Sequence, residues 1–137
     1  MTSTEVQERI AALTTVLGSI ETVLDLPKMR ESIEDLESQA SVPDLWDDQE
    51  HAQQITSRLS FVQGEVRKFE ALDRRLGDLP ILFELAEDEG DEAAVADALK
   101  ELDDLAQSIA ELEVRTLLSG EYHAREALIT IRAEAGG

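Results

Sequence analysis

The chain has 137 residues, of which 31 are acidic and 12 basic, so its formal net charge at pH 7 is -19, and it contains no cysteine. The lack of cysteine excludes a disulfide framework and thiolate chemistry. The negative charge argues against a domain that grips nucleic-acid phosphates or anionic lipid by itself. No apolar run approaches the roughly 18 residues that span a bilayer, and the N-terminus does not look like a secretory signal. We therefore expect a cytoplasmic protein that docks on no membrane.

Apolar residues at helical spacing predict a first helix that is interrupted near Pro27. A proline is tolerated in the first turn of a helix but not in its interior. We therefore expect a break at residues 25–27 and a restart toward residue 40. The stripe that defines these two segments recurs every three or four residues and comprises Val6, Ile10, Leu13, Leu17, Ile20, Leu24, Met29, Ile33 and Leu36.

Residues 41–46 are expected to form a loop, because the residue before Pro43 avoids the helical region. We expect Trp46 to pack where this loop returns onto the bundle, although its side chain also suits a partner-binding anchor. Asp47 is in position to cap the next helix, and Pro80 is expected to kink or break that helix. The stripe of this helix comprises Ile55, Leu59, Val62, Val66, Phe69, Leu72, Leu76 and Leu79.

A third stripe, from Val95 to Leu117, predicts another long helix that ends at Gly120. The β-branched run at residues 128–131 is typical of a strand. A lone strand has no partner for its backbone groups, so it either pairs with another chain or opens a missing second domain, which we favour. The expected fold is all-α: an elongated antiparallel three-helix bundle over residues 1–120, then a linker and first strand over 121–137.

Two clusters of charge stand out. Residues 84–104 contain ten acids and one base, Lys100, and they form either a solvated helix face or a contact for a basic partner. Their spacing does not fit a calcium loop, since Leu85 would have to supply the first ligand. The second cluster is basic and comprises Arg58, Arg67, Lys68, Arg74 and Arg75. Because acidic residues lie among these bases, we expect a salt-bridged surface rather than a nucleic-acid stripe.

The sequence offers little to build an active site. With no cysteine and only His51 and His123, a nucleophile–base pair is hard to assemble. No glycine-rich phosphate-binding motif is present. We therefore expect no catalytic residue, no metal ligand and no cofactor, and we expect that the chain is not an enzyme.

Four stretches of the chain, at residues 24–30, 43–48, 117–127 and 128–137, resemble a known family when they are read in order. They begin with Leu-Asp-Leu-Pro-Lys-Met-Arg and Pro-Asp-Leu-Trp-Asp-Asp, and they continue with Leu-Leu-Ser-Gly-Glu-Tyr and Leu-Ile-Thr-Ile-Arg. Together they are similar to the N-terminal domain of bacterial class-I peptide chain release factors, of the type that reads UGA and UAA. His123 and Glu134 depart from the residues that are common in the family.

The resemblance implies a helical domain that reaches the base of the large-subunit stalk and communicates with the GTPase release factor. In the family, the stop-codon tripeptide and the Gly-Gly-Gln hydrolysis motif follow the segment that corresponds to Gly137. No catalytic residue is therefore carried over, and the fragment is expected to be inactive. The charge suits basic ribosomal proteins better than ribosomal RNA. We expect a monomer whose partner contacts include Glu87, Asp88, Glu89 and Asp91.

A second interpretation comes from another class of protein. The chain would be a stand-alone acidic coiled-coil adaptor, or a chaperone-like oligomer, that associates through its apolar stripes. In that case the terminal strand would pair across a dimer.

Overall fold

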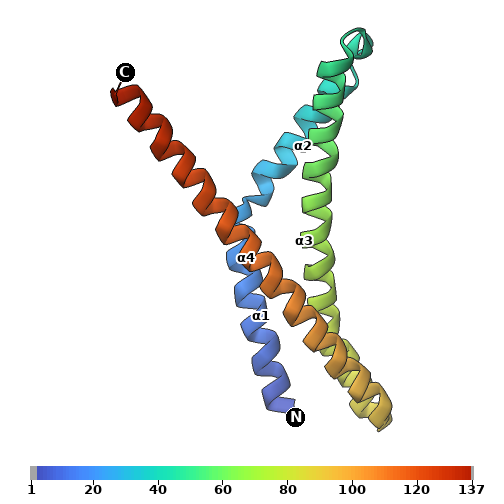
Figure 1. Ribbon diagram of the computed structural model, residues 1–137. Helices are drawn as coiled ribbons and strands as arrows, with labels where there is room; N and C mark the ends of the chain where they lie inside the picture. Colours follow the sequence, from blue (N-terminus) through green and yellow to red (C-terminus); the bar gives the residue numbers. More distant parts are fainter. Residues whose placement is uncertain (1–2, 137) are drawn as a thin grey trace.

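The computed structural model describes the backbone of residues 3–136 and the side chains of residues 3–118, and its regular structure in this range is helical. The order of elements is α1 (Ser3–Leu24), α2 (Leu26–Ala40), a short 3-10 helix η1 (Leu45–Asp47), α3 (Gln49–Glu89) and α4 (Glu92–Gly136). Figure 1 shows α1, one half of α3 and the first part of α4 packed together, while α2 runs antiparallel along the other half of α3. The expected all-α helical bundle is confirmed.

The break between α1 and α2 lies where the proline predicted it. Asp25 adopts a left-handed backbone conformation with φ 57°, and its carboxylate accepts a hydrogen bond from the Lys28 N–H at 3.3 Å. Pro27 sits in the first turn of α2, where its missing N–H has no helical acceptor in any case. The two helices are bent by 46°, and only this bent pair has the length and composition of a membrane span; no single helix in the described residues does.

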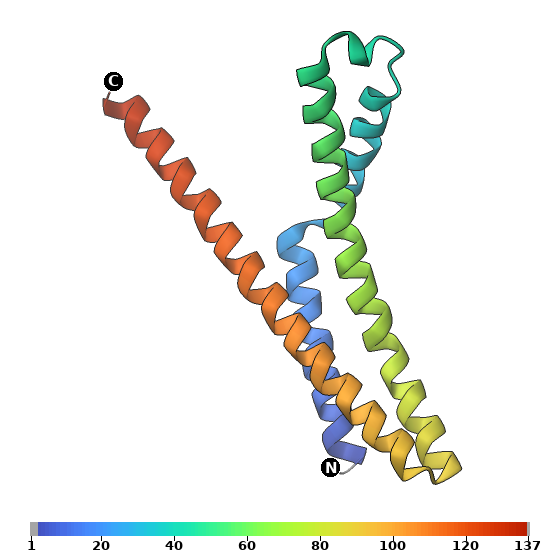
Figure 2. The same cartoon turned by 45° about the vertical axis from the view of Figure 1, so that its right-hand side comes forward.

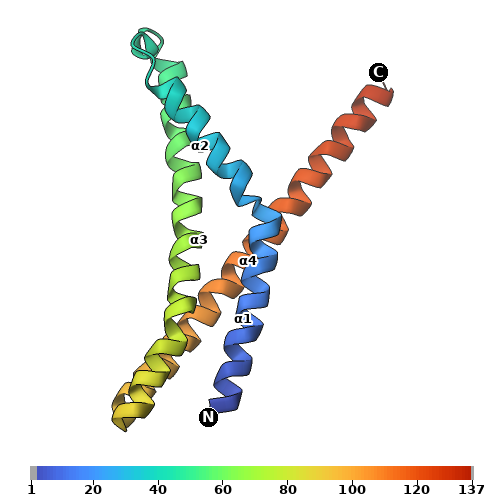
Figure 3. The ribbon, with the colours of Figure 1, turned by 180° about the vertical axis from the view of Figure 1, so that it is seen from behind.

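The main core lies where α1, α3 and α4 meet (Figures 2 and 3). Most of its buried members come from the stripes that the helical spacing predicts, whereas Leu26, Phe83 and Ala98 lie outside those stripes. Fully burying one such aliphatic side chain contributes roughly 1.5–3 kcal/mol, so these contacts dominate the stability of the bundle. The largest fully buried side chains are Leu26, Leu79, Leu102, Leu105 and Ile109.

A second, smaller core closes the α2–α3 hairpin around Leu36, Leu45 and Ile55. Here the expected packing of Trp46 is wrong: Leu45 is 6% exposed and Trp46 is 60% exposed. Both lie in η1, where successive side chains diverge by about 120°, so only one of the two can face the hairpin. The expected cap is also displaced by one residue, because Asp48 rather than Asp47 accepts from the His51 N–H, at 3.2 Å.

Helix α3 continues through Pro80 and is not broken there. Proline removes the N–H that would bond to the Leu76 carbonyl. Leu76, Leu79 and Phe83 are nevertheless all buried on the core side of the helix. Their packing on both sides of the proline holds the two halves of α3 in one helix.

The strand predicted at residues 128–131 is wrong, because the backbone there belongs to α4, and Gly120 does not end the helix. A helix pairs its backbone groups within one segment, whereas a strand needs a neighbour. Figure 2 shows this part of α4 extending away from the other helices, so no second strand lies beside it in the described residues. The domain boundary after residue 120 stays a prediction.

The hairpin core gives a test with two adjacent residues. We expect Leu45→Ala to lower the free energy of unfolding by about 2–5 kcal/mol, since it empties a buried site. Trp46→Ala, at an exposed position, should change it by no more than about 0.5 kcal/mol. Urea unfolding followed by far-ultraviolet circular dichroism measures both. Equal losses in the two variants would contradict the orientation of η1.

Candidate protein-interaction surface

The acidic turn, defined here as residues 87–91, connects α3 to α4. Gly90 has φ 64°, a left-handed conformation that glycine adopts at little cost. Its N–H donates to the Glu87 carbonyl at 3.1 Å, and the Asp91 N–H donates to the Ala86 carbonyl at 3.2 Å. This pair of bonds ends a helix by satisfying its last carbonyls. The chain therefore reverses sharply, and residues 87–90 are exposed to solvent.

The four predicted contact residues lie together on this turn, but they do not share one role. The Asp91 carboxylate accepts hydrogen bonds from the Ala93 and Ala94 N–H groups at 3.0 and 3.1 Å. Asp91 is thus the N-cap of α4. Three other exposed carboxylates of the acidic turn form no ion pair within residues 3–118; they belong to Glu87, Asp88 and Glu89.

The position of these three acids is electrostatically unfavourable for α3. The C-terminus of a helix carries a partial negative charge and is stabilised by basic side chains, yet the last turn of α3 contains none. The acids also repel one another in a chain of net charge -19. Folding of α3 therefore gives no reason for this cluster.

The basic residues of α3 are only partly paired. Arg75 Nε lies 2.7 Å from Glu101 Oε1, and Lys68 Nζ lies 3.5 Å from Glu65 Oε1. The salt-bridged surface that we expected is confirmed for these two bases. Three others form no ion pair within the part of the chain whose side chains are described; they are Arg58, Arg67 and Arg74.

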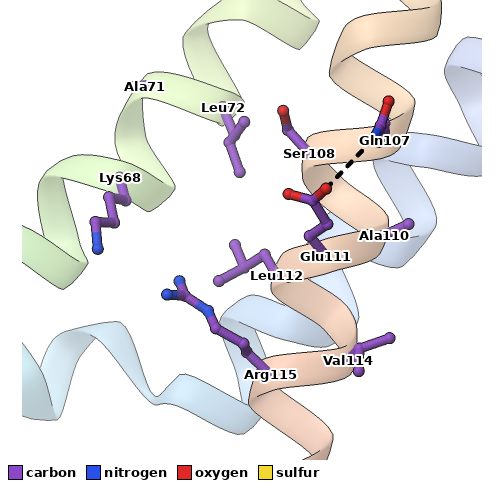
Figure 4. A pocket seen from close by; sticks show the side chains of 10 residues that line it. All are labelled: Lys68, Ala71, Leu72, Gln107, Ser108, Ala110, Glu111, Leu112, Val114 and Arg115. Atoms are coloured by element: carbon purple, nitrogen blue, oxygen red, sulfur yellow. Dashed lines mark hydrogen bonds between the residues drawn. The ribbon is translucent and has the colours of Figure 1, made fainter.

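A groove of about 870 Å³ lies between α3 and α4 at the level of Leu72 and Leu112. Figure 4 shows Leu72 of α3 and Leu112 of α4 pointing into the space between the two helices, whereas Ala110 and Val114 point away from it. Lys68 comes from α3 and Arg115 from α4, and Glu111 accepts a hydrogen bond from Gln107. The groove brings no histidine to these charged groups. Among the described residues, no group of three or more potential ligands is arranged to hold a metal ion.

The helices and the net charge thus define a class: a negatively charged all-helical domain. Comparison with known proteins gives the family. The PCRF domain profile matches residues 29–137. The chain is 57% identical to peptide chain release factor 2 of Acidothermus cellulolyticus over 95% of its length, and 55% identical to that of Streptomyces avermitilis over its whole length. It is 52% identical over 97% of its length to that of Rhodococcus jostii.

The chain therefore belongs to the PCRF-domain family of bacterial peptide chain release factors, and its relatives are of the release factor 2 type. It spans 35–37% of the length of these curated relatives.

Two features of the surface were not predicted from the sequence. The cap at Asp91 had a signal, an aspartate directly before an acidic first turn and an apolar stripe. The exposure of Trp46 had none, since Leu45 and Trp46 are both apolar residues of one short turn.

The N-cap at Asp91 allows a prediction about the free energy of unfolding. Asp91→Ala should lower the free energy of unfolding by about 1 kcal/mol, because two N–H groups of α4 lose their acceptor. Asp91→Asn keeps a side-chain acceptor and should retain most of that stability while it removes the charge. Urea unfolding compares the two. If Asp91→Asn lost as much stability as Asp91→Ala, the charge of Asp91 would matter more than its cap.

Proposed function

We propose that this chain is the ribosome-docking N-terminal domain of a cytoplasmic translation termination factor of the release factor 2 type. In the full-length protein it would serve recognition of UGA and UAA and the hydrolysis of peptidyl-tRNA. Its partners would be basic ribosomal proteins at the base of the large-subunit stalk and the GTPase release factor. The family and the names of the relatives support this proposal.

One structural observation carries the docking role. Glu87, Asp88 and Glu89 stand in the exposed last turn of a helix whose stability they lower. Features that break a local rule of folding are expected at functional sites. A cluster of carboxylates repels the phosphates of ribosomal RNA and attracts lysine and arginine side chains, so the partner it suits is a basic protein.

The rival interpretation, an acidic coiled-coil adaptor, is weakened by the backbone of residues 128–131. That segment is helical, so it offers no strand for pairing across a dimer. Two copies of a chain of charge -19 would also repel each other. We therefore propose a monomer.

We further propose that this chain by itself releases no peptide. The described side chains provide no paired nucleophile and base, and the relatives are almost three times as long as the chain. On ribosome complexes stalled at UGA, the purified chain should leave peptidyl-tRNA intact at every concentration, while a full-length relative hydrolyses it. Release of peptide by the chain alone would refute this part of the proposal.

The docking role is tested in a full-length factor that contains this domain. The triple variant Glu87→Gln, Asp88→Asn, Glu89→Gln should bind ribosomes more weakly, on the order of tenfold, and its affinity should depend less on salt. Its free energy of unfolding should not fall, since repulsion is relieved. The affinity is measured by competition with labelled wild-type factor over a salt series.

A matched control removes three exposed acids elsewhere: Glu31→Gln, Glu34→Gln and Asp73→Asn. The control has the same net charge as the test variant but keeps the acidic turn. If both variants lost affinity equally, the effect would be one of total charge. The acidic turn would then have no specific part in docking.

A further inference from the structure

A second groove between α3 and α4 lies next to the acidic turn and encloses about 490 Å³. Its apolar lining comes from one face of each helix and comprises Leu82, Leu85, Ala86, Ala94 and Ala98. Leu82 is 44% exposed and Leu85 54% exposed, so two large side chains of this lining have no cover. Exposed apolar residues that are clustered and rimmed by polar groups mark sites of association.

This groove lies on a different face of α3 from the one that α1 covers. On the side of α3 that faces α1, a pocket between the two helices is lined by Pro80, Phe83, Glu84 and Glu87, and none of these residues lines the α3–α4 groove. Figures 1 and 3 show α1 behind α4 in one view and in front of it in the opposite view. The α3–α4 hairpin therefore holds a helix against one side and leaves its other side open.

The shape of the groove suits another helix. Its lining residues follow helical spacing on α3 at positions 78, 82, 85 and 89, and on α4 at 94, 97, 98 and 101. The alanines among them leave room for the ridge of a third helix between the two. Amphipathic helices bind in such grooves with apolar anchors spaced by three or four residues.

The rim selects the charge of the occupant. Asp78, Glu89 and Asp97 line the groove and form no ion pair in the side chains described. The single base of the lining, Arg75, is already paired with Glu101 at 2.7 Å. The rim is thus negative, which disfavours RNA and a second copy of this acidic chain and favours lysine and arginine.

Helix α1 shows the same recognition within the chain. It presents an apolar stripe to α3 and α4, and Arg9 Nη2 lies 2.9 Å from Asp103 Oδ1 of α4. Helix α1 therefore packs on the α3–α4 hairpin through an apolar stripe with a basic residue beside it.

We propose that the open α3–α4 groove binds a basic amphipathic helix of a protein partner. The leucine-like side chains of that helix contact Leu82 and Leu85, and its lysines or arginines meet Asp78, Glu89 and Asp97. The inference rests on the proposed function for the class of partner, a basic protein of the ribosome, and it adds the form in which that protein is recognised.

The probe is a fluorescein-labelled synthetic peptide with leucines at three- and four-residue spacing and lysines elsewhere. A scrambled peptide of the same composition keeps the charge and loses the stripe. By fluorescence anisotropy, the chain should bind the striped peptide at least about tenfold more tightly than the scrambled one. Leu82→Ser and Leu85→Ser should each abolish most of that difference.

Two controls match these variants. Ile81 is 56% exposed and neighbours Leu82 but does not line the groove, so Ile81→Ser should bind the peptide as the parent chain does. Asp97→Asn should weaken binding, whereas Glu84→Gln, on the side that faces α1, should not. The five substituted positions, residues 81, 82, 84, 85 and 97, are exposed or lie on the rim of the groove. Circular dichroism verifies that each variant is folded.

Three outcomes would overturn the proposal: equal binding of both peptides, equal loss in Ile81→Ser and Leu82→Ser, or a dimer in sedimentation that Leu82→Ser dissociates. The assay contains no ribosome, so it fails independently of the proposed function. If the groove bound the peptide while the acidic-turn triple variant kept full ribosome affinity, only ribosome docking by the acidic turn would be refuted. If ribosome affinity fell while the groove variants bound the peptide normally, only the groove would be refuted.

Discussion

Covering the apolar side of α3 is the constraint on which the rest of the structure depends. This helix has 41 residues, so it is roughly 60 Å long at 1.5 Å per residue. Helix α2 covers one end of it, and α1 with α4 covers the other. The bend of 46° at Asp25 follows from this division, since one straight helix would leave one of the two cores without its partner.

Apolar contacts hold this arrangement together, because the electrostatic terms oppose it or contribute little. The ion pairs between helices, such as Arg9–Asp103 and Arg30–Glu70, have partners that are between a third and two thirds exposed, and pairs of this kind typically contribute less than about 1 kcal/mol. A net charge of -19 adds repulsion across the whole molecule. The acids at residues 87–89 fold against this repulsion with no cap or ion pair among the described side chains, and for them we propose a role in binding.

The extent to which the sequence predicts this structure depends on how local each interaction is. Helical stripes and the Pro27 break depend on residues within a turn or two, and both were predicted correctly. The orientation of Trp46 depends on which side of η1 meets the hairpin, and the strand at residues 128–131 depended on a neighbour that the described backbone does not contain. The acids at residues 87–89 are visible in the sequence, but the open groove beside them is not, because it forms only where α3 and α4 pack against each other.

The same geometry explains why an open groove and an acidic rim occur together. A three-helix bundle leaves one inter-helical groove of its central hairpin uncovered, and an apolar groove in water promotes self-association. Carboxylates such as Asp78, Glu89 and Asp97 around Leu82 and Leu85 make pairing between identical acidic chains unfavourable. They leave the apolar lining available to a helix of opposite charge. In the arrangement that we propose, these rim acids disfavour pairing of identical chains and favour a basic helix.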